Sequence, residues 1–444
     1  MTLIADLVSA GWQARWSAGP RERELAARHV LDALGCAVAG REHPISGRLA
    51  RWLGEPAGAS RAEVLRYATL THIDEFDSIH PASAVLPCAS VVPAAFLRAA
   101  ADHRSGGQLL DAVLAGSEIA IEAGLRFGGP ALYANSWWPS ALFGSLGAAA
   151  ATCILLGLDR AATESALGIC AAGLGGLLSD SVLGDGHYLL VGRAAADGVD
   201  AADAAACGMR ASTSLLDGPA AAALQQQPTA RDRPPIPHLA GSAIKPYPCA
   251  RPLHAVVAAL TELAVDADLA TATNFTVLLP GPLLRFVTAE REPAGPAEAA
   301  ASAACAIAAA LAGRAADPAF FRAARPVPHL AVHLAASQDL ARAFPQHWAA
   351  TVEVTFSSGS RIRRTVLDAP GDPSQPLTDD EIIGKFRQQA ASLGARAADD
   401  LVRECLDLDA VEDVAALADL LGVAMPQNRR RPPEARVAQA RAGD

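Results

Sequence analysis

The sequence predicts a mainly α protein with a large all-helical domain and a smaller α+β domain. Apolar residues recur with helical spacing in the first 264 residues, as at Ala27, Val30, Leu31, Leu34 and Val38. Hydrophobic residues make up 51% of the chain and charged residues only 19%, which indicates extensive helix burial or a buried oligomer interface. Beyond about residue 265 the apolar pattern changes to the period of two that is typical of strands.

Capping signals set several helix boundaries in the first part. The helix predicted over 22–40 stops at Gly40. Ser105 followed by Gln108 is a capping box that begins a helix running through Leu125. Asp159 caps the next helix, which is expected to end near residue 173. These helices are rich in alanine and glycine, so their axes can approach closely and a tight bundle is predicted. Residues 225–238 contain four prolines and are predicted to be an exposed or lid-like loop.

The α+β domain is predicted over residues 265–395. Residues 275–280 are a strand candidate, and residues 351–356 alternate, with Val352, Val354 and Phe356 on one face. Residues 357–360 turn the chain and residues 361–366 return, which predicts a hairpin. Thr378 with Glu381 is a second capping box. Residues 396–424 are expected to return to the helical domain begun by residues 1–264, and residues 425–444 to form a disordered tail.

Composition argues against several classes of protein. The net charge is −10, whereas binding of nucleic-acid phosphates needs clustered cations. None of the eight cysteines has CxxC or metal-ligand spacing, so a reduced, cytoplasmic protein without a metal is expected. The longest apolar runs, 142–158 and 299–313, are short and dominated by alanine and glycine, which predicts buried helices and no membrane span.

The densest polar cluster lies in residues 71–81 and carries His72, Asp74, Glu75, Asp77 and His80. An apolar, proline-bounded segment follows it. Polar groups packed beside a buried helix cost free energy unless something uses them. A functional site and a helix-capping loop with surface acids both fit this composition.

A second candidate segment spans residues 244–254. It carries Lys245, Arg251 and His254 just before an apolar helix, and the only other lysine of the chain is Lys385. Cations at the start of a helix suit an anion-binding site. An ordinary proline-rich turn explains the segment equally well.

Two further segments contain polar or aromatic candidates. Residues 135–144 place Trp137 and Trp138 before Ser140 at a loop-to-helix junction, where tryptophans can wall a pocket or pack in a core. A glycine-rich stretch over 173–186 leads to His187. It contains neither a GxGxxG pattern after a strand nor a P-loop pattern, so nucleotide binding is not supported.

Taken in order, these segments resemble the MmgE/PrpD family, which includes 2-methylcitrate dehydratase, cis-aconitate decarboxylase and iminodisuccinate epimerase. Ordered matches lie in residues 29–40, 72–81, 143–159, 192–198, 245–254 and 370–386. The most specific is Lys-Pro-aromatic-Pro-x5-His, which runs from Lys245 to His254. The resemblance implies an all-helical domain, a small α+β lid, a homodimer, and a site in the cleft between domain and lid.

The resemblance and the chemistry of these side chains together give two sets of candidate residues. The catalytic set is Asp74, Asp77, His80, Lys245 and His254, and the substrate-binding set is His72, Trp138, Ser140, His187, Arg251 and Cys305. The acidic loop is shorter than is common in the family and has Asp77-Ser78 in place of a paired Asp-Asp, and three further positions depart from the family pattern. Trp138 stands in place of a histidine, His187 in place of a lysine and Cys305 in place of a tyrosine. The implied substrate is a small carboxylate that is bulkier or less anionic than a tricarboxylate.

The expected function is that of a cofactor-independent lyase. Dehydration is the preferred reaction type, and decarboxylation and epimerisation are its variants. Each of these builds enolate-like charge beside a carboxylate, and fixed cations must stabilise it while an acid or base moves a proton. An isomerase or cyclase of a specialised metabolite and a non-catalytic homologue are the alternatives. The expected partners are the substrate and a second copy of the chain, with no nucleic acid and no membrane.

Overall fold

The computed structural model describes residues 1–54, 56–178, 184–222, 224 and 237–425. In the described ranges, the first part of the chain is built of helices joined by loops and has no strand longer than an isolated bridge. Its α-helices are α1 (Leu3–Ser17), α2 (Pro20–Gly40), α3 (Ser46–Leu53), α4 (Arg61–His72), α5 (Pro87–Ala101), α6 (Gly106–Arg126), α7 (Pro139–Leu155), α8 (Arg160–Ala172), α9 (Asp185–Ala206) and α10 (Pro219–Ala222).

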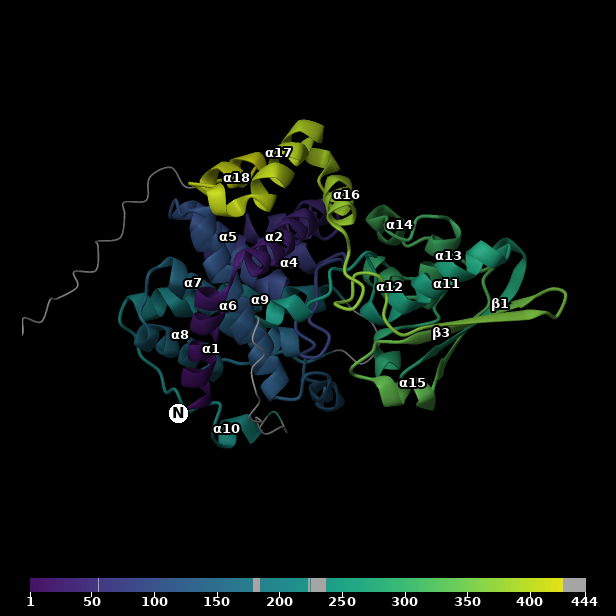
Figure 1. The fold of residues 1–444 in the computed structure, drawn as a ribbon, viewed down its shortest axis with the longest axis horizontal. Coiled ribbons are helices and arrows are strands. Elements are labelled where there is room, and N and C mark those ends of the chain that lie inside the picture. Colours follow the sequence, from purple (N-terminus) through teal and green to yellow (C-terminus); the bar gives the residue numbers. More distant parts are fainter. Residues whose placement is uncertain (55, 179–183, 223, 225–236, 426–444) are drawn as a thin grey trace, which may run out of the picture.

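The second part mixes strands and helices, and the last part is helical again. The strands are β1 (Ala272–Leu279), β2 (Val332–Ala336), β3 (Ala350–Phe356) and β4 (Arg361–Val366). The helices are α11 (His254–Asp266), α12 (Pro296–Ala301), α13 (Ala303–Leu311), α14 (Pro318–Arg322), α15 (Gln338–Ala343), α16 (Asp379–Gln389), α17 (Ala395–Leu406) and α18 (Ala415–Leu420). Figure 1 shows the helical part and the sheet-containing part side by side. The predicted fold class, mainly α with a smaller α+β part, is confirmed.

Close helix packing in the first part depends on glycine. Helix α7 is packed against α5, α6 and α9. A Cβ on Gly116 of α6 would lie 2.6 Å from the carbonyl oxygen of Gly147 in α7, and a Cβ on Gly147 would lie 2.6 Å from that of Gly116. A Cβ on Gly198 of α9 would likewise lie 2.6 Å from the carbonyl oxygen of Ser145 in α7. The small residues therefore bring the backbones into contact, as the composition predicted.

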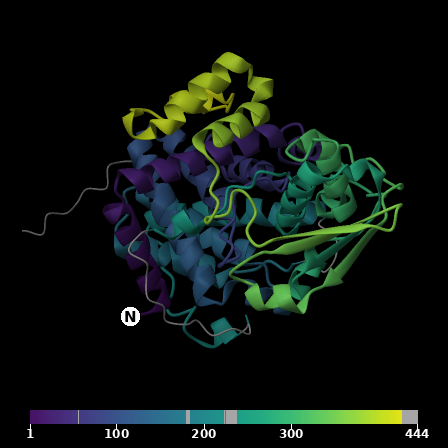
Figure 2. The ribbon, with the colours of Figure 1, turned by 45° about the vertical axis from the view of Figure 1, so that its right-hand side comes forward.

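The sheet has the strand order β2-β1-β3-β4. Strand β1 pairs with β2 in parallel and with β3 antiparallel, and β3 forms with β4 the hairpin predicted from the alternating pattern. Val352 and Val354 of β3 are fully buried, and helix α11 packs against β3, β4 and α13. Figure 2 shows the sheet beside the helical part after a rotation of 45°.

Two helices near the predicted domain boundaries pack across them. Helix α11 precedes residue 265 but belongs by its contacts to the sheet, because its apolar residues share one buried cluster with the strands. Helix α16 precedes residue 395, yet Ile382 and Phe386 join the helical core beside α2. Helices α17 and α18 also lie on the helical part, against α2 and α5.

The local signals used above correspond to observed helix ends. The capping boxes at Ser105 and Thr378 are both formed, and the Asp159 side chain caps α8. No helix in the ranges that the structure describes is long and apolar enough to cross a bilayer. The predicted loop over 225–238 lies almost wholly outside the described residues, as does the predicted tail from residue 426 onward.

Candidate active site

The polar segment after α4 folds back over the end of that helix. His72 is the last residue of α4, and Glu75 adopts a left-handed conformation with φ of 54°. This conformation is uncommon for a residue with a Cβ, so the surrounding contacts must hold it. Lys245 supplies one such contact, because its Nζ donates to the backbone carbonyl of Glu75 at 3.0 Å.

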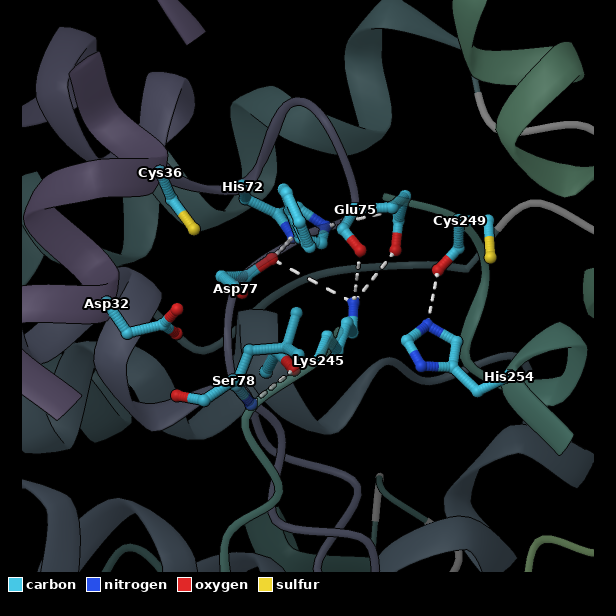
Figure 3. Close-up of polar contacts among 12 residues, drawn as sticks. Asp32, Cys36, His72, Glu75, Asp77, Ser78, Lys245, Cys249 and His254 are labelled. Atoms are coloured by element: carbon cyan, nitrogen blue, oxygen red, sulfur yellow. Dashed lines mark hydrogen bonds and ion pairs between the residues drawn. The ribbon is translucent and has the colours of Figure 1, made fainter. Parts of the chain in front are cut away.

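A buried ionic cluster forms around Lys245 (Figure 3). Its Nζ lies 3.4 Å from Glu75 Oε2 and 3.9 Å from Asp77 Oδ1. Asp77 in turn lies 2.8 Å from His72 Nδ1. All four side chains are at most 8% exposed. The segments 71–81 and 244–254 therefore meet in one site, although about 170 residues separate them.

His187, in the first turn of α9, completes the cluster. Its Nε2 lies 3.5 Å from His72 Nε2 and 3.9 Å from Glu75 Oε1. Its ring stacks on the indole of Trp138, with centroids 4.0 Å apart. Trp138 is the N-cap residue of α7, and Pro139 at the first helical position fixes the entry of that helix.

These side chains open onto a pocket between the helical and sheet-containing parts. Of the candidate residues, His72, Trp138, His187, Lys245 and Arg251 line it. The remaining wall is mostly apolar or aromatic in the part of the chain that the structure describes. It consists of Glu75, Ile79, Ala84, Leu86, Tyr133, Leu178, Ala250, Pro252, Phe286 and Trp348. The pocket therefore suits a ligand that joins a carboxylate to an apolar portion.

Arg251 is oriented by a residue far along the chain. Its guanidinium forms a buried ion pair with Asp372 and lies over the Trp348 ring, 5.9 Å from the centroid. Asp372 Oδ2 also accepts a hydrogen bond from the backbone of Ala369 at 2.9 Å. Part of the charge of Arg251 is thus neutralised inside the protein, although Arg251 is one of the residues that line the pocket.

The two site histidines have opposite electrostatic environments. Burial disfavours a charged His72, but the nearby Asp77 and Glu75 carboxylates outweigh burial and raise its pKa. Its place at the C-terminal end of α4 also favours a cation. For His187, burial and the cations of His72 and Lys245 hold the pKa well below its usual range. Its place at the N-terminal end of α9, where a cation is disfavoured, also lowers this pKa.

The Asp77 carboxylate remains ionised in this environment. Burial alone would raise its pKa, but His72 and Lys245 outweigh burial and lower it. Asp77 therefore acts as the fixed anion that orients the His72 ring through Nδ1, leaving Nε2 directed at His187.

Six candidate residues do not line this pocket. Asp77 belongs to the ionic cluster through His72 and Lys245, and the other five have partners elsewhere. Asp74 is paired with Arg322 of α14, with 2.9 Å between Oδ1 and Nε. His80 contacts Ser83 through Nδ1, and His254 is 3.1 Å from the carbonyl oxygen of Cys249, away from Lys245 (Figure 3).

The other two have local structural contacts. Ser140 Oγ accepts from the backbone of Leu86 and donates to that of Ala84, which joins α7 to the loop before α5. Cys305 lies in the buried cluster of the sheet-containing part. None of these five residues lines the pocket, so no pocket contact supports their predicted roles in catalysis or binding.

The candidate set omits several residues that shape the site. Glu75 lies inside the polar segment, and its position between His72 and Asp77 is the sequence feature that could have indicated it as a site residue. Asp372 was signalled by the motif at 370–373, but only the fold shows that it pairs with Arg251. Tyr133 and Trp348 gave no signal, because an isolated aromatic residue reads as core.

The fold also creates a set of metal-ligand type side chains. One ligand atom each from His72, Glu75 and His187 lies within 4.8 Å of the others. The expectation of no metal was based on spacing along the sequence. That spacing does not detect this set, because His187 is 115 residues from His72.

Comparison with known proteins gives matches over most of the chain. The MmgE/PrpD N-terminal domain matches residues 14–227 and the MmgE/PrpD C-terminal domain matches residues 247–408. The cis-aconitate decarboxylase-like protein oryM of Aspergillus oryzae is 30% identical over 174 residues, which are 34% of this chain and 36% of that protein. Cis-aconitate decarboxylase of Aspergillus terreus is 30% identical over 169 residues, 34% of either chain.

The chain thus spans about a third of the length of these curated relatives. The two domain matches are broader, since they extend over both the helical part and the sheet-containing part. They include His72, Trp138, His187 and Arg251, whereas Lys245 lies between the two matched ranges. The chain belongs to the MmgE/PrpD family.

Proposed function

We propose that the protein is a lyase that removes water from a small hydroxycarboxylate by acid–base catalysis, without an organic cofactor. The observation that carries the proposal is the pair His72 and His187, whose Nε2 atoms lie 3.5 Å apart at the wall of a pocket that also contains Lys245. Elimination of water needs both an acid and a base. Two imidazoles in opposite environments supply both.

The surroundings of each ring suggest its role. His72 lies between the carboxylates of Asp77 and Glu75, which favour the imidazolium, so it is the proposed acid. His187 stacks on Trp138, and among the described residues the carboxylate recorded near it is that of Glu75, 3.9 Å from Nε2, so His187 is the proposed base. His187 takes the proton from the carbon next to the substrate carboxylate. The electron pair forms the C=C bond, and the β-hydroxyl leaves with the proton from His72.

The same contact offers a way to restore the resting state. After elimination, His187 carries the extra proton and His72 has lost one. Their Nε2 atoms are 3.5 Å apart, so a small movement of either ring lets the proton pass back to His72. Asp77 and Glu75 favour this direction of transfer, because they stabilise the charge on His72.

Lys245 and Arg251 are the proposed partners of the substrate carboxylate. Both line the pocket, and an enolate-like charge beside a fixed cation in a water-poor site is strongly stabilised. Arg251 shares its charge with Asp372, and Lys245 shares its charge with Glu75 and Asp77, so both cations stay candidates for this role. The apolar wall of Ile79, Leu86 and Leu178 suits a substrate with fewer charges than a tricarboxylate.

Decarboxylation is the second candidate, and the two fungal relatives, a cis-aconitate decarboxylase and a cis-aconitate decarboxylase-like protein, favour it. Loss of CO2 needs an acid to protonate the carbanion, and His72 fits that role without His187.

One assay separates these reactions. The purified chain is incubated in D2O with a panel of small hydroxycarboxylates and unsaturated di- and tricarboxylates, followed by NMR and by CO2 release. Formation of an alkene without CO2 supports dehydration, and CO2 release supports decarboxylation. Loss of whichever activity appears in His72→Gln ties it to this site. No turnover of any panel member would contradict the proposal.

A further inference from the structure

We propose that His72, Glu75 and His187 form a binding site for a divalent transition-metal ion of the Zn²⁺ type. The three ligand atoms are His72 Nε2, Glu75 Oε1 and His187 Nε2. Their separations are 3.5 Å between the two nitrogens, 3.5 Å from His72 to Glu75 and 3.9 Å from His187 to Glu75. Bonds of ~2.0–2.1 Å in a tetrahedral site place ligand atoms about 3.3–3.4 Å apart. Shifts of a few tenths of an ångström therefore produce a metal geometry.

The ligands are already oriented by their neighbours. His72 Nδ1 lies 2.8 Å from Asp77 Oδ1, and a hydrogen bond from Nδ1 leaves the Nε2 lone pair free to face the cluster. Metal-binding histidines commonly have such a carboxylate partner. His187 is held by its stacking on Trp138, and Glu75 by the Lys245 contacts to its carbonyl and to Oε2.

Two buried side-chain atoms of these three residues have no hydrogen-bond partner among the described residues. They are Glu75 Oε1 and His187 Nδ1. A buried carboxylate oxygen without a hydrogen bond costs free energy, and Glu75 Oε1 is the oxygen that faces both histidines. A metal ion between the three side chains would satisfy it.

The donor set indicates the kind of ion. Two imidazole nitrogens and one carboxylate oxygen suit Zn²⁺ and similar borderline ions, whereas Mg²⁺ and Ca²⁺ prefer oxygen ligands. Three protein ligands leave further coordination positions free, and all three residues line the pocket. The site is therefore accessible to an ion that enters through the pocket.

Zn²⁺ binding to the full chain tests this inference. The chain is stripped with a chelator, and Zn²⁺ is titrated in competition with a chromophoric chelator. One equivalent is expected to bind. Asp77→Asn removes the carboxylate partner of His72 and should lower the Zn²⁺ affinity ~10–100-fold. His187→Ala and Glu75→Gln are each expected to lower it at least as much. His254→Gln is the matched control, because this buried histidine lies outside the cluster, and it should leave the affinity unchanged.

Co²⁺ supplies a second readout, since its visible absorption reports the coordination geometry of the bound ion. A Co²⁺ spectrum that is absent in His187→Ala supports the site, with circular dichroism showing that the variant is folded. Failure of the parent chain to bind either ion, or binding that His187→Ala and Glu75→Gln both leave unchanged, would overturn the inference.

The binding measurement needs no substrate, so it succeeds or fails independently of the proposed lyase activity. One consequence for turnover rests on the proposed function, because His72 Nε2 cannot carry a proton and a metal ion at the same time. Zn²⁺ is therefore expected to slow turnover by the parent chain, and a chelator to restore it. Turnover unaffected by saturating Zn²⁺ would contradict the proton-transfer role of His72 while leaving the measured binding intact.

Discussion

Lys245 and Lys385, the only two lysines in the sequence, bind adjacent backbone carbonyls of the same loop, those of Glu75 and Phe76. Lys245 Nζ donates to the carbonyl of Glu75, and Lys385 Nζ donates to the carbonyl of Phe76 at 2.8 Å. Lys385 also forms a buried ion pair with Asp32 and lies 4.0 Å above the centre of the Phe76 ring. The compact ammonium group can enter such narrow spaces, whereas a guanidinium needs more room.

This relationship makes the two lysines a matched pair for mutation. Lys245 lines the pocket, whereas Lys385 holds the loop from outside it. Lys245→Met is expected to lower kcat/KM by roughly 10²-fold or more, because it removes the cation that stabilises developing charge. Lys385→Met should lower the melting temperature, because it leaves Asp32 buried without its cation, but should cost much less activity. Equal losses of activity in the two variants would reduce Lys245 to a loop-positioning residue.

Substitution of the site histidines tests the proton-transfer roles. His72→Gln and His187→Gln are each expected to lower kcat by ~10²–10⁴-fold, the usual contribution of a general acid or base. His254→Gln, at a buried histidine outside the pocket, should lower kcat by far less. Steady-state kinetics on the substrate found in the panel provide the measurement. A His187→Gln variant with parental kcat would remove His187 as the base.

Gly371 joins the motif at 370–373 to the lysine segment. Its φ is 88°, its carbonyl accepts from the backbone of Ile244 at 3.1 Å, and a Cβ would lie 2.1 Å from the carbonyl oxygen of Ile244. Gly371→Ala should therefore lower the free energy of unfolding by more than the ~1–3 kcal/mol of backbone strain alone, and should reduce turnover by displacing Lys245.

Gly359 in the hairpin turn is the control for this substitution. Its φ is 81°, but a Cβ there would meet no atom within 4 Å. Gly359→Ala is expected to cost only the strain, with parental turnover. Chemical denaturation measures both variants, and equal destabilisation would show that the contact with Ile244 adds nothing.

Glu122 predicts a pH-dependent contribution to stability outside the site. It is buried, and it contacts His238 Nε2 at 2.9 Å and Arg126 Nε at 2.7 Å. Burial alone would raise the pKa of Glu122, but these two partners lower it to about 2. Because the folded pKa lies below the unfolded value near 4.5, the contribution is complete above pH 4.5 and is lost as the pH falls toward 2.

Glu122→Gln is therefore expected to lower the free energy of unfolding by ~1–3 kcal/mol at pH 7. The difference from the parent should shrink between pH 4.5 and pH 2. Urea unfolding at several pH values measures it, with the exposed Glu292→Gln as control, which should stay within ~0.5 kcal/mol of the parent. A difference that is the same at pH 7 and pH 3 would contradict this account of Glu122.

Much of the fold could be predicted because its signals are local. The capping boxes at Ser105 and Thr378 and the hairpin of β3 and β4 each depend on residues a few positions apart. The domain edges could not be placed in this way. Helices α11 and α16 look like ordinary amphipathic segments, and only their packing partners, the sheet and α2, assign them to one part or the other.

The sequence by itself determined the mainly α class, the family, and the two polar segments that carry Lys245 and His72. Tertiary structure alone decided which polar residues share a pocket. Asp74, His80 and His254 lie in the same segments as His72, Asp77 and Lys245, yet they contact Arg322, Ser83 and the Cys249 carbonyl instead. Within a turn, neighbouring side chains point in different directions. Which of them meets a residue more than a hundred positions away depends on how the helices pack, and no local pattern records that packing.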